Sequence, residues 1–164
     1  MYELISIITN NGTIIENIPN DLYIPEDLKR FYEITNNNIV VMGRKTFDTL
    51  KNPLKNRINI VITRNKELKN AVNLFYCNLD ELENTLKNLK NLNKKVFIIG
   101  GGEIYNSLID SCNILHLTIA YKDIVGKDKL LLDNINKNYK LVEESQLYYS
   151  TNSKCNYKYL TYKK

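Results

Sequence analysis

Apolar positions along the chain follow two spacings in turn, and the alternation predicts strands separated by helices. Short runs rich in Ile, Val and Leu, typical of buried strands, lie at 2–8, 38–43, 58–64, 95–100 and 114–121. Helical spacing and helix-start signals predict helices at 25–36, 44–50, 80–92 and 103–110. The tail differs, because 139–145 and 157–164 both predict strands with no helix between them.

This order of elements predicts one α/β domain spanning residues 1–164. Strands that alternate with helices favour a mainly parallel central sheet flanked by helices, and the last two strands add an antiparallel C-terminal hairpin at one edge. The length of 164 residues is enough to bury roughly two thirds of the unfolded surface. Because Cys77, Cys112 and Cys155 are odd in number and widely spaced, they predict neither a disulfide framework nor a metal site.

Charge and hydropathy narrow the possible partners. The net charge is +5 and the isoelectric point is near 9.0, which suits nucleic acid or a small polyanionic ligand. The lysines are dispersed and often lie beside asparagine, so the charge indicates a compositional bias rather than a nucleic-acid surface. No apolar run approaches roughly 18 residues, and no basic segment precedes the first apolar stretch, so we expect a cytoplasmic protein without membrane association. The single histidine, His116, is expected within a strand.

The stretch VFIIGGGEIY places three consecutive glycines, Gly100, Gly101 and Gly102, between a predicted strand and a predicted helix. Glycine costs backbone entropy inside an element, so this cluster suggests a conformation or a close approach that a Cβ forbids. The first N–H groups of the following helix also point outward and favour an anion such as phosphate. A plain tight turn is the alternative.

Two further strand ends carry groups suited to phosphate. In MGRKTF, Gly43 is followed by Arg44, Lys45 and Thr46, and in VITRN a hydroxyl precedes the guanidinium of Arg64. Ligands of open α/β sheets bind outside the carboxyl ends of the strands, where these stretches meet. Two glycine turns and two arginines exceed the needs of one phosphate, and together they predict a dinucleotide with an additional phosphate. Either arginine alone is more simply a solvated surface charge.

The predicted helix at 25–36 carries a carboxylate and an aromatic ring on one face. Asp27 and Phe31 are four residues apart, with Leu28 beside them. Such an aspartate is either drawn into an apolar cleft that holds a ligand or is a solvated acid favoured by the helix dipole. On this pattern alone the solvated acid is the simpler interpretation.

Taken together, PEDLKRF with Thr35 four residues on, VVMGRKTFDTL, PLKNR, NIVITR and VFIIGGGEIY occur in the order and at the spacings of dihydrofolate reductase. The sequence resembles that family from Leu4 to the C-terminus. The resemblance implies NADPH-dependent reduction of 7,8-dihydrofolate to tetrahydrofolate, which supplies one-carbon metabolism and thymidylate synthesis. It also implies small-molecule partners only, namely dihydrofolate, NADPH and antifolate-type inhibitors, with no nucleic acid, in a monomeric protein.

The resemblance also implies roles for individual positions. Asp27 is expected to bind the pterin ring, with Thr118 supporting that carboxylate and Tyr105 at the edge of the nicotinamide site, and these three are the candidate catalytic residues. Arg57 is expected to hold the α-carboxylate of the glutamate tail. The other implied substrate contacts are Ile5, Ile7, Leu28, Phe31, Leu50, Leu54 and Ile99. The implied cofactor contacts are Ile7, Ile14, Gly43, Arg44, Lys45, Thr46, Thr63, Arg64, Ile99, Gly100, Gly101, Gly102, Glu103, Ile104 and Tyr105, with a cis peptide bond expected between Gly100 and Gly101.

One loop departs from the family pattern. Ile15 stands where a glycine is expected, and Asn17 to Pro19 resemble a displaced form of the next motif. The chain contains no tryptophan, and Leu22 is nearest to the position where the family carries one. Ile7 replaces a small residue facing the pterin, and Asp128 lies near an acidic loop position. The altered loop keeps a catalytically weak or silent relative open as an alternative. A pyrimidine reductase of riboflavin biosynthesis is the other, although it requires neither Asp27 beside Phe31 nor Arg57.

Overall fold

The computed structural model describes residues 1–15, 22–89, 93–130 and 132–164. Strands and helices alternate along these residues as far as β6, except that β3 is followed directly by β4. The strands are β1 (Tyr2–Thr9), β2 (Ile39–Gly43), β3 (Ile58–Ile62), β4 (Leu74–Cys77), β5 (Val96–Gly100), β6 (Cys112–Tyr121), β7 (Lys140–Glu144), β8 (Tyr148–Ser150) and β9 (Cys155–Lys163). The helices are α1 (Pro25–Thr35), α2 (Arg44–Leu50), α3 (Leu82–Asn88), α4 (Gly102–Leu108) and α5 (Leu132–Asn138), with a 3-10 turn η1 (Ile109–Ser111).

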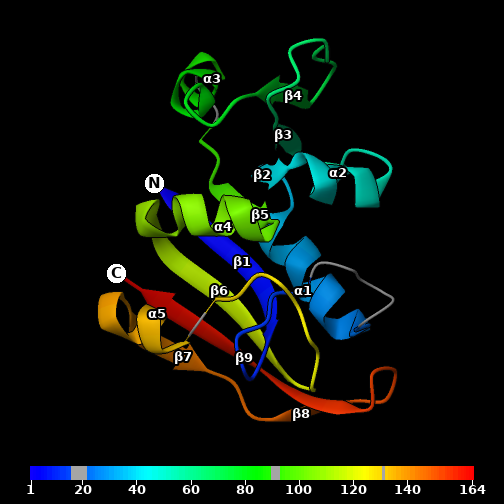
Figure 1. The fold of residues 1–164 in the computed structure, drawn as a ribbon, viewed down its shortest axis with the longest axis vertical. Coiled ribbons are helices and arrows are strands. Elements are labelled where there is room, and N and C mark those ends of the chain that lie inside the picture. Colours follow the sequence, from blue (N-terminus) through cyan, green and yellow to red (C-terminus); the bar gives the residue numbers. More distant parts are fainter. Residues whose placement is uncertain (16–21, 90–92, 131) are drawn as a thin grey trace.

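One sheet runs through the molecule in the order β4-β3-β2-β5-β1-β6-β9-β7, and β8 also pairs with β9 (Figure 1). The strands from β4 to β6 are parallel, whereas β7, β8 and β9 form the antiparallel end of the sheet. This confirms the predicted α/β class with a mainly parallel sheet and antiparallel C-terminal strands. The long red strand β9 lies beside β6 in Figure 1.

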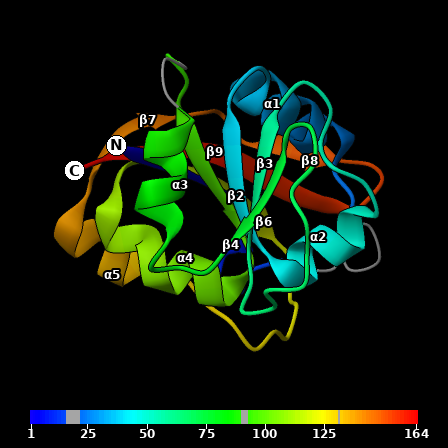
Figure 2. The same cartoon turned by 90° about the horizontal axis from the view of Figure 1, so that it is seen from above.

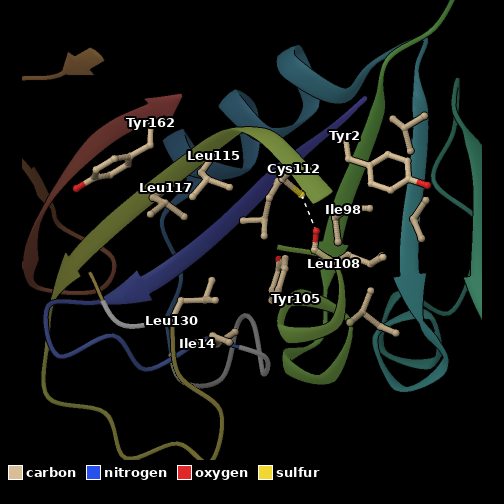
Figure 3. Packing of buried hydrophobic residues seen from close by; sticks show 14 of the residues in the cluster. Tyr2, Ile14, Ile98, Tyr105, Leu108, Cys112, Leu115, Leu117, Leu130 and Tyr162 are labelled. Atoms are coloured by element: carbon tan, nitrogen blue, oxygen red, sulfur yellow. Dashed lines mark hydrogen bonds between the residues drawn. The ribbon is translucent and has the colours of Figure 1, made fainter. Parts of the chain in front are cut away.

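Successive residues of a strand point to opposite faces of the sheet, so each strand contributes side chains to a hydrophobic layer on either face. Leu4 and Ile8 of β1 pack in a layer with side chains from α3, α4 and α5, part of which is drawn in Figure 3. Ile5, between them, packs on the other face with side chains of α1 and α2. Figure 2 shows α1 on the opposite side of the sheet from α3, α4 and α5. The two layers fix where α1 and α4 stand relative to the ends of the central strands.

Three elements were absent from the sequence prediction. β4, α5 and β8 are only 4, 7 and 3 residues long. β4 has a mixed burial pattern, and α5 reads LDNINKN, which contains three asparagines that favour turns over helix in isolation. Tertiary packing instead supports α5, because Ile135 is buried in the main core. The predicted helix at 80–92 extends over Leu82–Asn88, and residues 90–92 lie outside the described part of the chain.

A charged cluster lies near the amino ends of the central strands. His116 lies within β6, as predicted, and its Nε2 is 2.7 Å from Oε2 of Glu3 on β1. Nζ of Lys95 is 2.8 Å from the other oxygen of the same carboxylate. Burial disfavours ionisation of Glu3, but these two contacts outweigh it and hold its pKa below the usual value. Glu3 is therefore a buried, charged residue that links β1 to His116 of β6 and to Lys95, the residue before β5.

All three cysteines are free and buried, as the sequence suggested. Cys112 donates its thiol hydrogen to the carbonyl of Leu108 at 3.3 Å, marked by the dashed line in Figure 3. Burial raises the pKa of Cys112 to about 12. The side chain is therefore a protonated thiol with a packing role, because only the thiolate is reactive. Among the described residues, none of the helices is both long enough and apolar enough to span a bilayer.

Candidate active site

The carboxyl ends of β1 and β5 meet α1, α2 and the start of α4 around a cavity of about 360 Å³. Its lining is mostly apolar, with one carboxylate and a few hydroxyl groups. The lining residues are Ile5, Ser6, Ile7, Ile14, Ile15, Tyr23, Asp27, Leu28, Phe31, Thr46, Thr49, Leu50, Leu54, Ile99, Gly100, Gly101 and Tyr105. Such a cavity suits a flat organic ligand with a small number of polar anchoring points.

Asp27 supplies the carboxylate. It lies in the first turn of α1, which begins at Pro25, and its backbone N–H donates to the carbonyl of Ile24 at 3.0 Å. The hydroxyl of Thr118 on β6 donates a hydrogen bond to Oδ1 of Asp27, and Thr118 itself is buried. Burial raises the pKa of Asp27, while the Thr118 hydrogen bond and the charge of Arg30 oppose the rise. The interpretation of Asp27 as a solvated helix acid is therefore wrong.

The apolar walls of the cavity come from α1 on one side and from the end of α2 on the other. Leu28 and Phe31 extend along α1, and Leu50 at the end of α2 faces them with Leu54. All the apolar positions expected to contact the substrate line the cavity: Ile5, Ile7, Leu28, Phe31, Leu50, Leu54 and Ile99. The structure thus brings together residues that are up to 94 positions apart in the sequence.

Arg57 lies behind the wall formed by Phe31 rather than in the cavity itself. Its side chain is buried, donates from Nη1 to the hydroxyl of Thr35 at 3.0 Å, and lies 5.7 Å from the Phe31 ring and 5.3 Å from the Tyr32 ring. Burial lowers its pKa. Among the ion pairs of the described residues, none involves Arg57. A buried guanidinium without a carboxylate partner favours an anionic ligand.

The glycine turn has two structural explanations. The peptide bond between Gly100 and Gly101 is cis, as the family resemblance implied, and Gly100 has a φ of 120°, a conformation that side chains rarely adopt. A Cβ on Gly102 would lie 2.3 Å from Cβ of Asp128. The close approach expected at Gly102 is thus made by the protein's own Asp128. Tyr105, one turn into α4, donates its hydroxyl hydrogen to the carbonyl of Ile5 at 2.8 Å.

The second glycine turn lies against the first. A Cβ on Gly43 would be 3.1 Å from the Ile104 side chain and 3.7 Å from the backbone nitrogen of Gly101. The amino ends of α2 and α4 are therefore held side by side, and Thr46 from α2 reaches the cavity. Ile104 is buried in the core, and Glu103 is exposed. Neither of these two residues lines the cavity.

The cationic residues lie around this pair of turns. Parallel pairing of β2 with β3 sets Gly43 opposite Ile62, so Thr63 and Arg64 follow beside the start of α2. Arg64 and Lys45 are exposed. Arg44 is committed to an exposed ion pair on its own helix, with Nε 2.7 Å from Oδ1 of Asp48, a partner that the motif did not reveal. A phosphate at this position must compete with that carboxylate.

Leu22 and Tyr23, in the loop that departs from the family pattern, have different environments. Leu22 is 2% exposed and packs with Ile7, Ile15 and Tyr157, and it does not line the cavity. Tyr23 lines the cavity, and its backbone N–H and carbonyl both bond to the Ser153 hydroxyl at 2.7 Å. The comparison of Asn17 to Pro19 with the family motif falls outside the described residues.

Four lining residues were not among the contacts expected from the sequence: Ser6, Ile15, Tyr23 and Thr49. Ile15 was considered only as a replacement for a glycine, and no local pattern distinguishes Tyr23 from the adjacent Leu22. The alternation of β1 offers a signal for Ser6, because Ser6 stands between two residues expected to contact substrate.

Comparison with known proteins adds an independent line of evidence. A family model described as dihydrofolate reductase matches residues 1–164. Dihydrofolate reductase type 6 from Proteus mirabilis is 33% identical over 123 residues, covering 75% of this chain and 76% of that protein. Dihydrofolate reductase from Ureaplasma parvum serovar 3 is 32% identical over 120 residues, covering 73% and 74% respectively.

A solved structure is similar over nearly the whole chain. Dihydrofolate reductase from Enterococcus faecalis, complexed with NADP(H) and RAB-propyl, aligns with a TM-score of 0.82 at 25% sequence identity. The alignment covers 99% of this chain and 95% of that one.

Proposed function

This chain belongs to the dihydrofolate reductase family, and we propose that the cavity beside Asp27 is where it reduces its substrate. The protein is an NADPH-dependent reductase that converts 7,8-dihydrofolate to tetrahydrofolate. One observation carries the assignment of the site: a carboxylate whose pKa is raised by burial faces a largely apolar cavity and is supported from behind by a buried threonine.

We propose that Asp27 recognises the pteridine ring. Thr118 satisfies one carboxylate oxygen, and among the described residues no protein group donates to the other. That oxygen is available to a ligand, and a ring N–H with an adjacent amino group offers two donors for it. Charge-assisted hydrogen bonds of this kind contribute about 1.5–3 kcal/mol each. The aliphatic residues around them exclude water and strengthen the interaction.

Asp27 also bears on the proton that the reaction consumes. Reduction adds a hydride to the pteridine ring carbon and a proton to the neighbouring nitrogen N5, and Asp27 is the sole carboxylic acid among the described lining residues. The carboxylate holds the ring in one orientation and stabilises positive charge on it, which favours protonation from water. Direct proton donation by Asp27 is not required.

Arg57 is proposed to bind the glutamate tail. Its guanidinium is fixed by Thr35 and by two aromatic rings just beyond the Phe31 wall, so a substrate in the cavity extends toward it. A bidentate contact with the α-carboxylate would then satisfy a cation that has no acidic partner within the described chain.

The residues at the two glycine turns fit NADPH. The amino ends of α2 and α4 lie against each other at Gly43 and Gly101, and exposed Lys45 and Arg64 lie close to them in the sequence and the sheet. When bound, the nicotinamide supplies the hydride. We propose that Thr46, Thr63 and Arg64 hold its phosphates, and that Ile14 and Tyr105 border the ring. The remaining cofactor positions proposed are Ile7, Gly43, Arg44, Lys45, Ile99, Gly100, Gly101, Gly102, Glu103 and Ile104.

Further properties are proposed on the same basis. From the family resemblance we propose that residues 1–164 form one dihydrofolate-reductase-like domain and that the protein acts as a monomer in the cytoplasm. Antifolate-type inhibitors are expected to occupy the cavity beside Asp27, where the pteridine ring is placed.

The decisive experiment is spectrophotometric. NADPH oxidation by the purified protein should depend strictly on dihydrofolate and should fall at least a hundredfold at neutral pH in Asp27→Asn. Glu26→Gln, the neighbouring acid on the exposed side of α1, is the matched control and should retain activity. A folded wild-type protein that binds NADPH without oxidising it would instead identify a catalytically silent relative.

A further inference from the structure

Arg30 is a charged residue near the cavity whose position the proposed reaction does not explain. It lies three residues after Asp27 on α1 and therefore on the same face of the helix. It is partly buried, and its guanidinium carbon lies 4.5 Å from the centroid of the Tyr159 ring. A cation over an aromatic face at this distance is held in place by the ring quadrupole.

The ring that packs against Arg30 belongs to a cluster of three tyrosines on β8 and β9. Tyr159 pairs with Thr118 in the register of β6 and β9, so the same pair of strands supports both Asp27 and Arg30. The rings of Tyr148, Tyr157 and Tyr159 pack against one another with centroids 5.5–5.8 Å apart. The tyrosines hold the guanidinium on the face of α1 that carries Asp27.

The titratable groups around this pair come from α1, β7 and β9. Glu26 is the other acid in the first turn of α1, and the phenols of Tyr157 and Tyr159 on β9 are neutral because burial raises their pKa. Glu143 of β7 also interacts with Arg30. Among the ion pairs of the described residues, none joins Arg30 to Asp27, so the guanidinium acts through space and leaves the carboxylate oxygen open to a ligand.

We propose that Arg30 is a positioning residue that acts through Asp27: held against the Tyr159 ring, its charge keeps the Asp27 carboxylate ionised and ready to bind the pteridine. The inference deepens the proposed function and rests on it. A fixed positive charge disfavours protonation of every nearby group, both of Asp27 and of a pteridine bound to it. Arg30 therefore sets the lower end of the pH range in which the site binds substrate with a charged carboxylate.

Titration of the ligand-free protein tests the electrostatic part without any assay of activity. Carbon-13 NMR of aspartate carboxyl groups, with Asp27 assigned from Asp27→Asn, should show the pKa of Asp27 rising by about half a unit to one unit in Arg30→Met. Arg30→Lys retains the charge and should give most of the wild-type value. Tyr159→Leu removes the ring beneath the guanidinium and should shift the pKa in the same direction as Arg30→Met, by less.

The matched control is Lys29→Met. Lys29 is the adjacent residue on α1 and carries the same charge, but its side chain is 78% exposed and lies 3.9 Å from Glu33. The pKa of Asp27 should stay within about 0.2 units of wild type in this variant, because solvent screens the charge.

The activity profile supplies the second readout. On the acidic side of the pH profile, the pH at which kcat/KM for dihydrofolate is half-maximal should move upward in Arg30→Met by an amount similar to the shift in the Asp27 pKa. The profile of Lys29→Met should match that of wild type. An Asp27 pKa that is unchanged in Arg30→Met, or that moves equally in Lys29→Met, overturns the inference. If the Asp27 pKa shifts as expected but no variant oxidises NADPH with dihydrofolate, the proposed function fails and the coupling of Arg30 to Asp27 stands.

Discussion

The hydroxyl of Thr118 donates a hydrogen bond to the carboxylate of Asp27, which joins the middle of β6 to the first turn of α1. Thr118 is 1% exposed, so this contact is sheltered from water. The hydrogen bond fixes the orientation of the carboxylate before a ligand arrives. It also opposes the rise in pKa that burial imposes on Asp27.

Replacing Asp27 with asparagine should separate function from stability. The pKa of Asp27 is raised in the folded state, so its contribution to stability is fully present below the unfolded pKa and is lost as pH rises through the folded pKa. We therefore expect Asp27→Asn to be more stable than wild type at pH 7, by about 1 kcal/mol. Urea denaturation should show the difference shrinking toward pH 4, and a less stable variant at pH 7 would contradict it.

The same variant should have an altered pH profile of activity. Without the carboxylate, the site relies on dihydrofolate that is already protonated, so turnover in Asp27→Asn should recover as pH falls from 7 to 5. Steady-state rates at saturating NADPH measure this. A rate that is equal to wild type from pH 5 to 9 would show that Asp27 lies outside the chemistry.

Arg57→Leu should raise KM for dihydrofolate much more than KM for a pterin that lacks the glutamate tail. The substitution removes a charge-assisted contact that is remote from the reacting atoms and contributes about 1.5–3 kcal/mol of binding energy. KM for dihydrofolate should therefore rise roughly 10- to 150-fold. Lys55→Leu, two residues earlier and exposed, is the control. Equal effects on both substrates would place Arg57 away from the tail.

Arg64→Ala should weaken the preference for NADPH over NADH. An exposed guanidinium beside the start of α2 suits the additional phosphate, and losing one such contact costs about 1.5–3 kcal/mol in kcat/KM for NADPH. The rate with NADH should change little, and Lys66→Ala should leave the ratio unaltered. Identical kcat/KM for the two cofactors in the wild type would remove the basis for this assignment.

Introducing tryptophan at neighbouring positions should distinguish the buried side of the loop from its cavity side. Leu22 is fully packed, so Leu22→Trp should lower the free energy of unfolding by about 1–3 kcal/mol through overpacking, without accelerating hydride transfer. Tyr23→Trp points into the cavity and should cost less than 1 kcal/mol. A faster hydride-transfer step in Leu22→Trp would contradict this placement.

Glu3→Gln tests the charged cluster that Glu3 forms with His116 and Lys95 near the amino ends of the central strands. The pKa of Glu3 is lowered, so its contribution is present above the unfolded pKa and lost as pH falls through the folded pKa. We expect a loss of about 1–3 kcal/mol at pH 7 that shrinks below about pH 4. Glu33→Gln, in an exposed pair with Lys29, should cost less than about 0.5 kcal/mol.

Much of the fold follows from local pattern, since the strands with continuous apolar runs were predicted within a few residues. β8 was not, because three residues give no periodicity, and α5 was not, because its asparagines oppose helix until Ile135 packs in the core. The site positions came from family resemblance rather than from periodicity. Neither source shows that Leu22 faces inward, that Arg44 pairs with Asp48, or that Tyr159 lies beneath Arg30. These relationships depend on side-chain packing between distant segments.

The strand order has a consequence for the growing polypeptide. All the residues proposed to hold NADPH, the last of which is Tyr105, are synthesised before Thr118 and Tyr159, the residues that support Asp27 and Arg30. Asp27 is among the first residues made, yet it acquires its environment only when β6 and then β9 join the sheet. A nascent chain therefore contains the residues proposed to contact NADPH before it contains the two strands that support Asp27 and Arg30, and the complete substrate site requires the last strand.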